Sequence, residues 1–341
     1  ESVLSGRRRK QFGRPLDGLL ILDKPKGETS NHALQTVKRL FKANKAGHTG
    51  SLDPLATGLL PICFGEATKF SQFLLDSDKT YRVTAKLGIK TITGDAEGEV
   101  LETRAIIGVD RARLLDTVSG FLGSIKQVPP MYSALKHQGR PLYKLAREGI
   151  EVDRPARQIQ IFKLELLAFD GEDFELEVAC SKGTYIRSLV EDIGEVLGCG
   201  AHITVLRRLQ SGPFFAGQMH TMEAIESLLE TGGLPAIDNL LLPLSASVSH
   251  WPSIVLDENS AYSLKQGQRV QCPQSDVPSR LVDSNQSLLS GRGFNQPLSD
   301  VNWEGQAVQI WEKGTDNKHF LGIGAILEDG RLAPRRLIKL N

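Results

Sequence analysis

The stretch from residue 47 to residue 54 reads GHTGSLDP and places one aspartate, Asp53, among glycines, hydroxyls and a histidine. Turn-forming residues this dense do not continue a helix, so the stretch predicts a tight loop whose backbone is accessible to a ligand. An aspartate before a proline can also simply start a turn or cap a helix. From the residues alone, Asp53 is a candidate for a catalytic role or for a purely structural role in the turn.

The segments before this loop alternate strand and helix. Residues 18–22 read GLLIL, a short apolar run typical of a buried strand, and the proline and glycine of residues 23–27 predict the turn that ends it. A helix follows, with Ser30 or Asn31 as its expected cap and with Leu34 on its apolar face. The loop around Asp53 therefore comes soon after a strand–turn–helix unit.

Alternation of apolar and polar residues indicates a sheet in the middle of the chain. Over residues 80–87, Tyr81 shares one strand face with the apolar residues, and residues 158–166 and 173–181 alternate in the same way. These patterns predict half-buried strands of an antiparallel or mixed sheet. Residues 59–64 are also expected to be extended, and helices are expected over residues 66–75, 110–121 and 184–197.

Composition divides the chain into parts. Residues 1–16 are polar and basic without periodicity, which predicts a flexible arm, and residues 126–153 form an excursion rich in proline and basic residues. Residues 228–250 hold several glycines, prolines and serines and are the best candidate for a domain boundary. The short apolar segments beyond them predict a small all-β module.

The whole-chain composition excludes several classes of protein. The 341 residues are 40% hydrophobic and 24% charged, as in ordinary globular proteins, and no apolar run approaches the roughly 18 residues that cross a bilayer. The basic start of the chain does not resemble a secretory signal. The four cysteines form no C-x-x-C pair, which argues against structural zinc and for reduced thiols in a cytoplasmic protein.

Charge is unevenly distributed along the chain. The net charge is only +1, but residues 1–50 hold 11 Lys and Arg against 4 Asp and Glu. A basic region fits a polyanionic partner such as RNA, although a basic tail can also be a solvated end.

Four motifs place a basic or aromatic residue at the end of a predicted strand or in the turn after it. Each has a plain alternative, because a turn lysine is often only solvated and a strand tyrosine often belongs to the core. His48, Ser51 and Asp53 do not form a hydrolase triad, since no G-x-S-x-G elbow occurs. The phosphate-cradle and zinc-peptidase patterns are absent too, which favours cofactor-free chemistry. The motifs are residues 24–27, 47–54, 79–82 and 182–187.

The motifs together resemble those of the TruB-type pseudouridine synthases, which isomerise the T-loop uridine of tRNA. Seven ordered segments over much of the chain carry this resemblance. They are LDKPKG at 22–27, AGHTGSLDPLATG at 46–58, GEATK at 65–69, DKTY at 78–81, PMYSALK at 130–136, CSKGTYIR at 180–187 and LRR at 206–208.

The resemblance implies an α+β fold and a domain plan. The fold is a mixed, largely antiparallel sheet flanked by helices, with a small C-terminal β-barrel-like PUA domain that binds RNA. Residues 17–250 correspond to the catalytic domain, residues 126–153 to a thumb-like insertion that embraces the RNA, and residues 251–341 to the PUA-like domain. The resemblance also implies a monomer with no metal and no cofactor.

The resemblance assigns a role to each residue of the reaction centre. Asp53 corresponds to the family's catalytic aspartate, a nucleophile or a carboxylate stabiliser that acts without metal. Arg187 corresponds to the arginine that pairs with it and keeps it ionised. Tyr81 corresponds to the tyrosine that stacks on the flipped uracil and serves in proton transfer at C5.

The resemblance also implies contacts to RNA. His48 corresponds to a motif histidine that fills the gap left by the flipped base, and Lys24, Lys69, Lys182 and Tyr185 are expected to contact the RNA. Two departures from the family pattern are visible. Ile92 stands where the family usually has an aspartate, and residues 271–296 match the family poorly.

The expected function is isomerisation of uridine to pseudouridine at position 55 in the T loop of tRNA, by base flipping. One alternative keeps the fold but requires a guide RNA and partner proteins, for which the basic arm is too short to resemble the usual extensions. A second alternative is a catalytically idle RNA-binding or RNA-folding protein, which the presence of Asp53, Tyr81 and Arg187 disfavours.

Overall fold

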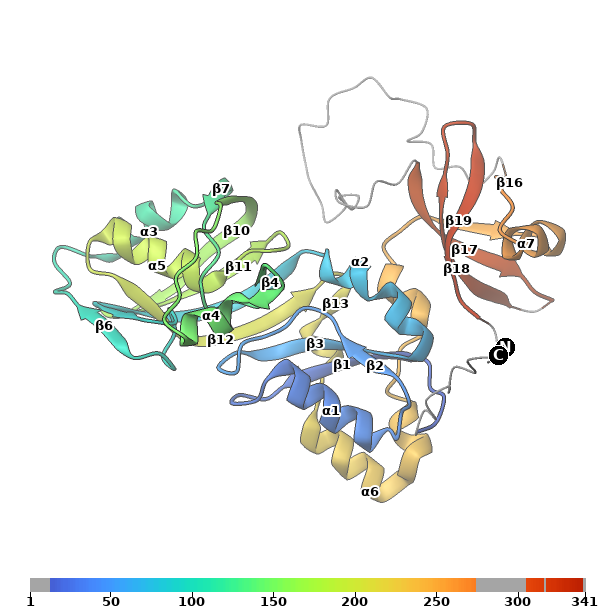
Figure 1. Cartoon of the computed structure of the whole chain (residues 1–341), viewed down its shortest axis with the longest axis horizontal. Coiled ribbons are helices and arrows are strands. Elements are labelled where there is room, and N and C mark those ends of the chain that lie inside the picture. The colour runs from blue at the N-terminus through green and yellow to red at the C-terminus, as the bar shows by residue number, and fades with distance from the viewer. Residues whose placement is uncertain (1–12, 274–304, 316, 340–341) are drawn as a thin grey trace, which may run out of the picture.

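The fold is built on one large mixed sheet, seen in a computed structural model that describes residues 13–273, 305–315 and 317–339 (Figure 1). Eight of its ten strands are hydrogen-bonded in the order β14-β1-β3-β12-β4-β11-β10-β7. The other two strands, β2 and β13, pair with β3 and β12. The pairs β1–β14 and β3–β12 are parallel and the others antiparallel. The strands are β1 Gly18–Lys24, β2 Ala46–His48, β3 Thr57–Phe64, β4 Lys79–Leu87, β7 Gly123–Gln127, β10 Arg157–Phe169, β11 Asp173–Cys180, β12 Ala201–Ser211, β13 Phe214–Phe215 and β14 His220–Thr221.

Helices cover the two ends of this sheet. In Figure 1, α1 and α6 lie beside β1 and β2, whereas α3 and α5 lie against the other part of the sheet, where α3 contacts β10 and α5 contacts the central strand β12. Their apolar faces meet the sheet in one continuous core. The helices are α1 Ser30–Leu40, α2 Ser71–Leu75, α3 Arg111–Ser119, α4 Leu142–Arg147, α5 Ile186–Leu197 and α6 Met222–Asp238, with short 3-10 helices η1 Gly65–Phe70, η2 Ala216–Gln218 and η3 Leu244–Val248.

Two small hairpins extend from the large sheet. The first pairs β5 Ile89–Thr91 with β6 Val100–Thr103. The second pairs β8 Lys136–His137 with β9 Arg140–Pro141 and leads into α4, so it lies in the excursion expected over residues 126–153. No helix in the ranges that the structure describes is long and apolar enough to cross a membrane.

A second sheet forms the C-terminal module, with the strand order β15-β17-β18-β19-β16 and the helix α7 Glu258–Lys265 beside it. It has its own apolar core. Its strands are β15 Ser253–Leu256, β16 Val270–Gln271, β17 Gln306–Lys313, β18 Lys318–Ile326 and β19 Arg331–Leu337. The large mixed sheet and this curled second sheet confirm the predicted fold class. Most of the expected basic arm, residues 1–12, and most of the poorly matching segment 271–296 lie outside the described residues.

Aromatic rings join the two sheets. Phe70 contacts Phe320 with ring centroids 5.9 Å apart, and Phe73 contacts Trp251 edge-on at 5.2 Å. Phe70, Phe73 and Ile323 are buried in one cluster, so η1 and α2 form the docking face for the C-terminal module.

Several expected element details were wrong. Thr29, not Ser30 or Asn31, caps α1, because its hydroxyl accepts the N–H of His32. The helix expected over residues 66–75 is divided into η1 and α2. Within residues 228–250, α6 continues to Asp238 and absorbs the glycines in a kink at Gly233, where φ is 68°.

Gly58 shows how closely β3 and β12 approach each other. Its φ is +100°, and a Cβ atom on it would lie 2.3 Å from the main-chain oxygen of Arg208. Such a contact requires the strands to move apart, so only glycine fits this position without distortion.

We expect Gly58→Ala to lower the free energy of unfolding by about 3 kcal/mol or more, because the backbone clash adds to the cost of positive φ. Gly171→Ala is the matched control, since Gly171 has φ +109° and open space around its Cβ position. It should cost about 1–2 kcal/mol, the penalty of the backbone conformation alone. Urea denaturation measures both, and equal losses would contradict the close-approach explanation.

Candidate active site

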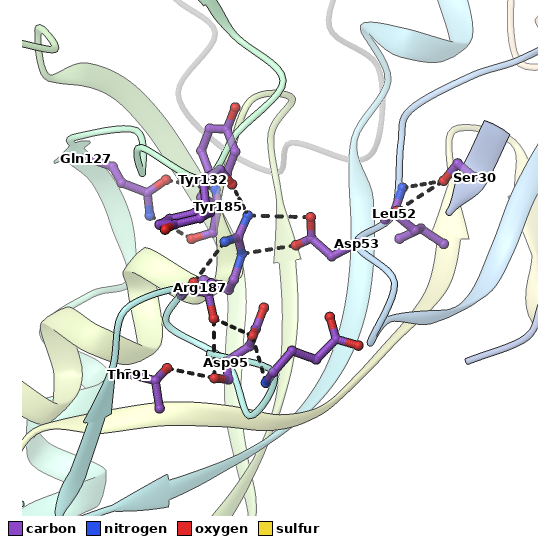
Figure 2. A network of polar contacts seen from close by, with 11 residues as sticks. Ser30, Leu52, Asp53, Thr91, Asp95, Gln127, Tyr132, Tyr185 and Arg187 are labelled. Carbon is purple, nitrogen blue, oxygen red and sulfur yellow. Dashed lines mark hydrogen bonds and ion pairs between the residues drawn. The ribbon is translucent and has the colours of Figure 1, made fainter. Parts of the chain in front are cut away.

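The loop that carries Asp53 connects β2 to β3 and is fixed to the helix before it. The Ser30 hydroxyl accepts the N–H of Leu52 at 2.8 Å and donates to the Leu52 carbonyl at 3.1 Å, as Figure 2 shows. The N–H of Gly27 donates to the carbonyl of Pro54 at 2.8 Å. These bonds on both sides of Asp53 confirm that it lies on a tight loop, and they make that loop rigid.

Asp53 forms an ion pair with Arg187 from the first turn of α5. Arg187 Nε lies 3.0 Å from Asp53 Oδ2, and Nη2 donates to Oδ1 at 3.4 Å. The Arg187 side chain is 5% exposed, whereas that of Asp53 is 41% exposed. The carboxylate is therefore open to a ligand while its cation lies behind it in the protein (Figure 2).

Main-chain carbonyls hold the Arg187 guanidinium in place. Nη1 donates to the carbonyl of Thr93 at 2.8 Å, and Nη2 donates to the carbonyl of Tyr132 at 2.6 Å. Tyr132 belongs to the excursion at residues 126–153. Arg187 therefore connects that segment to Asp53.

Burial raises the pKa of the Asp53 carboxyl above its usual range, and the charge of Arg187 opposes this rise. The charge of Asp95 raises the pKa of Asp53 further. Asp95 is buried, with a carboxylate that accepts from the Thr93 hydroxyl at 2.6 Å and from the N–H of Glu97 at 3.1 Å.

Asp95 is a site residue that the sequence analysis missed. The feature of the sequence that could have identified it is its position three residues after Ile92, in the loop after β5. Ile92 is itself exposed, and the carboxylates that this loop places near Asp53 are those of Asp95 and Glu97.

Tyr81 lies on β4, partly buried against the core, as the strand pattern predicted. It faces Arg208 on β12 and Val178 on β11 across the sheet. Burial raises the pKa of the phenol, while the charge of Arg208 opposes that rise. The hydroxyl therefore stays protonated at neutral pH.

His48 ends β2 next to the Asp53 loop. Burial and the charge of Arg208 lower the pKa of its imidazole, which is therefore neutral at pH 7. Among the described residues, its buried Nδ1 has no hydrogen-bond partner.

Lys24 does not occupy the position expected of a phosphate contact. It is fully buried, and its Nζ donates to the carbonyls of Pro25 at 2.8 Å and Glu28 at 2.6 Å, with Pro54 at 3.5 Å. Burial lowers the pKa of this amine to about 8. Lys24 thus joins the turn after β1 to the Asp53 loop.

Of the other expected RNA contacts, Tyr185 belongs to the network in Figure 2. Tyr185 precedes α5, and its backbone exchanges two hydrogen bonds with the buried side chain of Gln127, at 2.8 and 3.0 Å. Lys69 pairs with Glu66 at 2.5 Å. Lys182 lies 3.3 Å from Asp76 at the end of α2. The described ranges contain no group of His, Cys, Asp and Glu that could hold a metal ion.

Comparisons with known proteins assign this chain to a family. Residues 38–186 match the model of the TruB family pseudouridylate synthase N-terminal domain. The chain belongs to the TruB family of pseudouridylate synthases. Residues 187–249 match the tRNA pseudouridylate synthase B C-terminal domain, and residues 296–338 match the pseudouridine synthase II TruB C-terminal model.

Individual relatives agree with the family models. The chain is 51% identical to tRNA pseudouridine synthase B of Coxiella burnetii (strain Dugway 5J108-111), over 97% of each chain. It is also 51% identical to the protein of the same name in Stutzerimonas stutzeri (strain A1501), over 97% of this chain and 98% of the relative. A crystal structure of a Cbf5-Nop10-Gar1 complex contains a chain of the same fold, with a TM-score of 0.66, 22% identity and coverage of 98% of this chain and 91% of that one.

The paired bonds between Ser30 and Leu52 predict a measurable contribution to stability. Ser30→Ala leaves a buried N–H and a buried carbonyl without partners, so we expect the free energy of unfolding to fall by about 1–3 kcal/mol. Ser119→Ala is the control, because the exposed Ser119 hydroxyl donates only to the Leu115 carbonyl within α3. Its loss should stay within about 0.5 kcal/mol. Equal losses in denaturant titrations would show that Ser30 is not a special anchor.

Proposed function

We propose that this TruB-family protein converts uridine to pseudouridine at position 55 in the T loop of tRNA, without a cofactor, and that Asp53 is its catalytic residue. The observation that carries the proposal is the exposed carboxylate of Asp53 on a rigid loop, paired with the buried Arg187. The names of the curated relatives support tRNA as the substrate.

The chemistry fits an aspartate whose charged form is favoured by a neighbouring arginine. The N1–C1′ bond of uridine breaks, a C5–C1′ bond forms, C5 loses its proton and N1 gains one. A carboxylate can act as nucleophile or stabilise charge in this sequence, and it needs neither metal nor redox chemistry. Arg187 favours the charged form of Asp53 against the cost of burial.

The neighbouring side chains supply a place for a flipped base. The Tyr81 ring offers a stacking face, and its protonated hydroxyl can take part in the proton transfer at C5. His48 is neutral and ends the strand that leads into the Asp53 loop, which suits a wedge that replaces the base in the RNA stack. Lys69, Lys182 and Tyr185 remain proposed RNA contacts, whereas the burial of Lys24 favours a loop-positioning role.

The fold also supports a domain assignment. We assign residues 17–250 to the catalytic domain, with residues 126–153 as a thumb-like insertion, and residues 251–341 to a PUA-like RNA-binding domain. Tyr132 contacts Arg187 from within the insertion, so this segment reaches the site. One chain contains Asp53, Tyr81 and Arg187, which fits a monomer acting on cytoplasmic tRNA.

Asp53→Asn is expected to abolish pseudouridine formation while RNA affinity changes only a few-fold, because phosphate contacts dominate binding. The assay incubates the purified protein with an unmodified T-arm stem-loop and maps pseudouridine chemically. Asp238→Asn is the matched control, since Asp238 also pairs with an arginine, Arg14, at 2.6 Å, but outside the site. The control should keep full turnover.

Two outcomes of this assay would refute the proposal. Near wild-type turnover by Asp53→Asn would exclude the catalytic assignment. A wild-type protein that forms product only after addition of a guide RNA and partner proteins would favour the guide-dependent alternative, and binding without any product would favour the idle one.

The pH dependence of turnover should report the Asp53 carboxyl. Because burial raises its pKa above the ordinary value of 3.8, kcat/KM should fall on acidification with a midpoint above that value. Arg187 lowers this pKa, so Arg187→Gln should move the acid limb to higher pH, in addition to reducing the rate. Single-turnover rates at a series of pH values test this. An acid limb that moves to lower pH in Arg187→Gln would contradict it.

A further inference from the structure

Arg208 is a buried cation to which the resemblance assigned no role, although it belongs to the LRR motif at residues 206–208. It lies on β12, is 1% exposed, and has one of the largest fully buried side chains in the described part of the protein. None of the ion pairs between described residues includes it. Burying a guanidinium without a carboxylate partner costs free energy, so the presence of Arg208 at this buried position needs an explanation.

The guanidinium spans the Asp53 loop and the strand that follows it. Nε donates to the carbonyl of Leu59 on β3 at 2.6 Å, and Nη2 donates to the carbonyl of Gly50 at 2.9 Å. Gly50 has φ +72°, and a Cβ atom there would lie 3.2 Å from Nη1 of Arg208. The planar fork therefore fixes the loop three residues before Asp53.

The backbone of Arg208 is fixed as firmly as its side chain. It pairs with Tyr81 across the antiparallel β4 and with Gly58 across the parallel β3. A Cβ atom on Gly58 would lie 2.3 Å from the main-chain oxygen of Arg208, so β3 and β12 are closely packed at this point. The charge of Arg208 also acts on the Tyr81 phenol, where it opposes the rise in pKa that burial causes. One residue thus contacts both the Asp53 loop and the tyrosine of the site.

We propose that Arg208 is a positioning residue, which holds the Asp53 loop and the Tyr81 phenol in the mutual arrangement that the isomerisation needs. The inference rests on the proposed function. Arg208 is buried and does not touch the RNA, so it acts on the rate of the chemical step rather than on substrate binding. Small displacements of reacting groups have large effects on rate, which is why a rigid cation at this point matters.

The test compares Arg208→Met with the wild-type protein on an unmodified T-arm stem-loop. Met keeps the apolar stem and removes all the donors, so we expect kcat to fall about 100-fold, the loss typical of a misplaced reacting group. KM and the RNA Kd should stay within about threefold, because phosphate contacts dominate RNA binding. Measurements are made well below the thermal midpoint of each variant, so that a lower stability alone does not reduce kcat.

Arg208→Lys is the conservative variant, and it also covers the case in which Arg208→Met does not fold. Lysine retains the positive charge but has one nitrogen in place of the fork, so it should recover about tenfold of the lost kcat and not all of it. Arg207→Gln is the matched control. Arg207 is the preceding residue of β12, donates to Asp23 at 2.7 and 3.0 Å and to the Thr57 hydroxyl at 3.3 Å, and makes none of the bonds to Gly50 and Leu59 that Arg208 makes. Its kcat should stay within about threefold of wild type.

The possible outcomes are distinct. A fall in kcat with unchanged Kd in the Arg208 variants, but not in Arg207→Gln, supports the positioning role. Three results would overturn the positioning role. A folded Arg208 variant could keep the wild-type kcat, or its change could be confined to KM and Kd. The third result is an equal fall of kcat in Arg207→Gln. A wild-type protein that forms no pseudouridine refutes the proposed function instead, and that result is read before any variant is compared.

Discussion

The site depends on one constraint: main-chain carbonyls that point into the protein interior need hydrogen-bond donors. Tight loops leave such carbonyls without helix or sheet partners, and a buried unpaired carbonyl is costly. Here buried cations supply the donors: Lys24 for the turn after β1, Lys79 for the end of α2, Arg187 for the segments at Thr93 and Tyr132, and Arg208 for the Asp53 loop. The loops can therefore be short and rigid.

The same cations set the electrostatics of the site. Arg187 and Lys24 lower the pKa of the Asp53 carboxyl, which burial and Asp95 raise, and Arg208 lowers the pKa of the His48 imidazole. Burial brings the amine pKa of both Lys24 and Lys79 to about 8. The stability of the loops and the pKa of Asp53 consequently depend on some of the same side chains. A substitution of one of them is expected to change both.

The sequence predicted the strands β1, β3, β4, β10 and β11 of the large sheet, the loop position of Asp53 and the apolar setting of Tyr81, because each follows from local periodicity or turn chemistry. It did not predict the central strand β12. It did not predict the burial of Lys24, since depth depends on neighbours distant in the chain. Asp95 was missed for the same reason.

The aromatic contacts between η1, α2 and the C-terminal module have a thermodynamic consequence. Phe70 and Phe73 belong to the first unit but complete their packing only against Trp251 and Phe320 of the second. Each unit therefore presents an unpaired aromatic face once the other melts. Interfaces between domains that are small and polar allow independent melting, whereas shared ring packing penalises it. The shared ring packing favours cooperative unfolding of the two sheets, in which heat or denaturant that loosens the module also weakens η1 and α2.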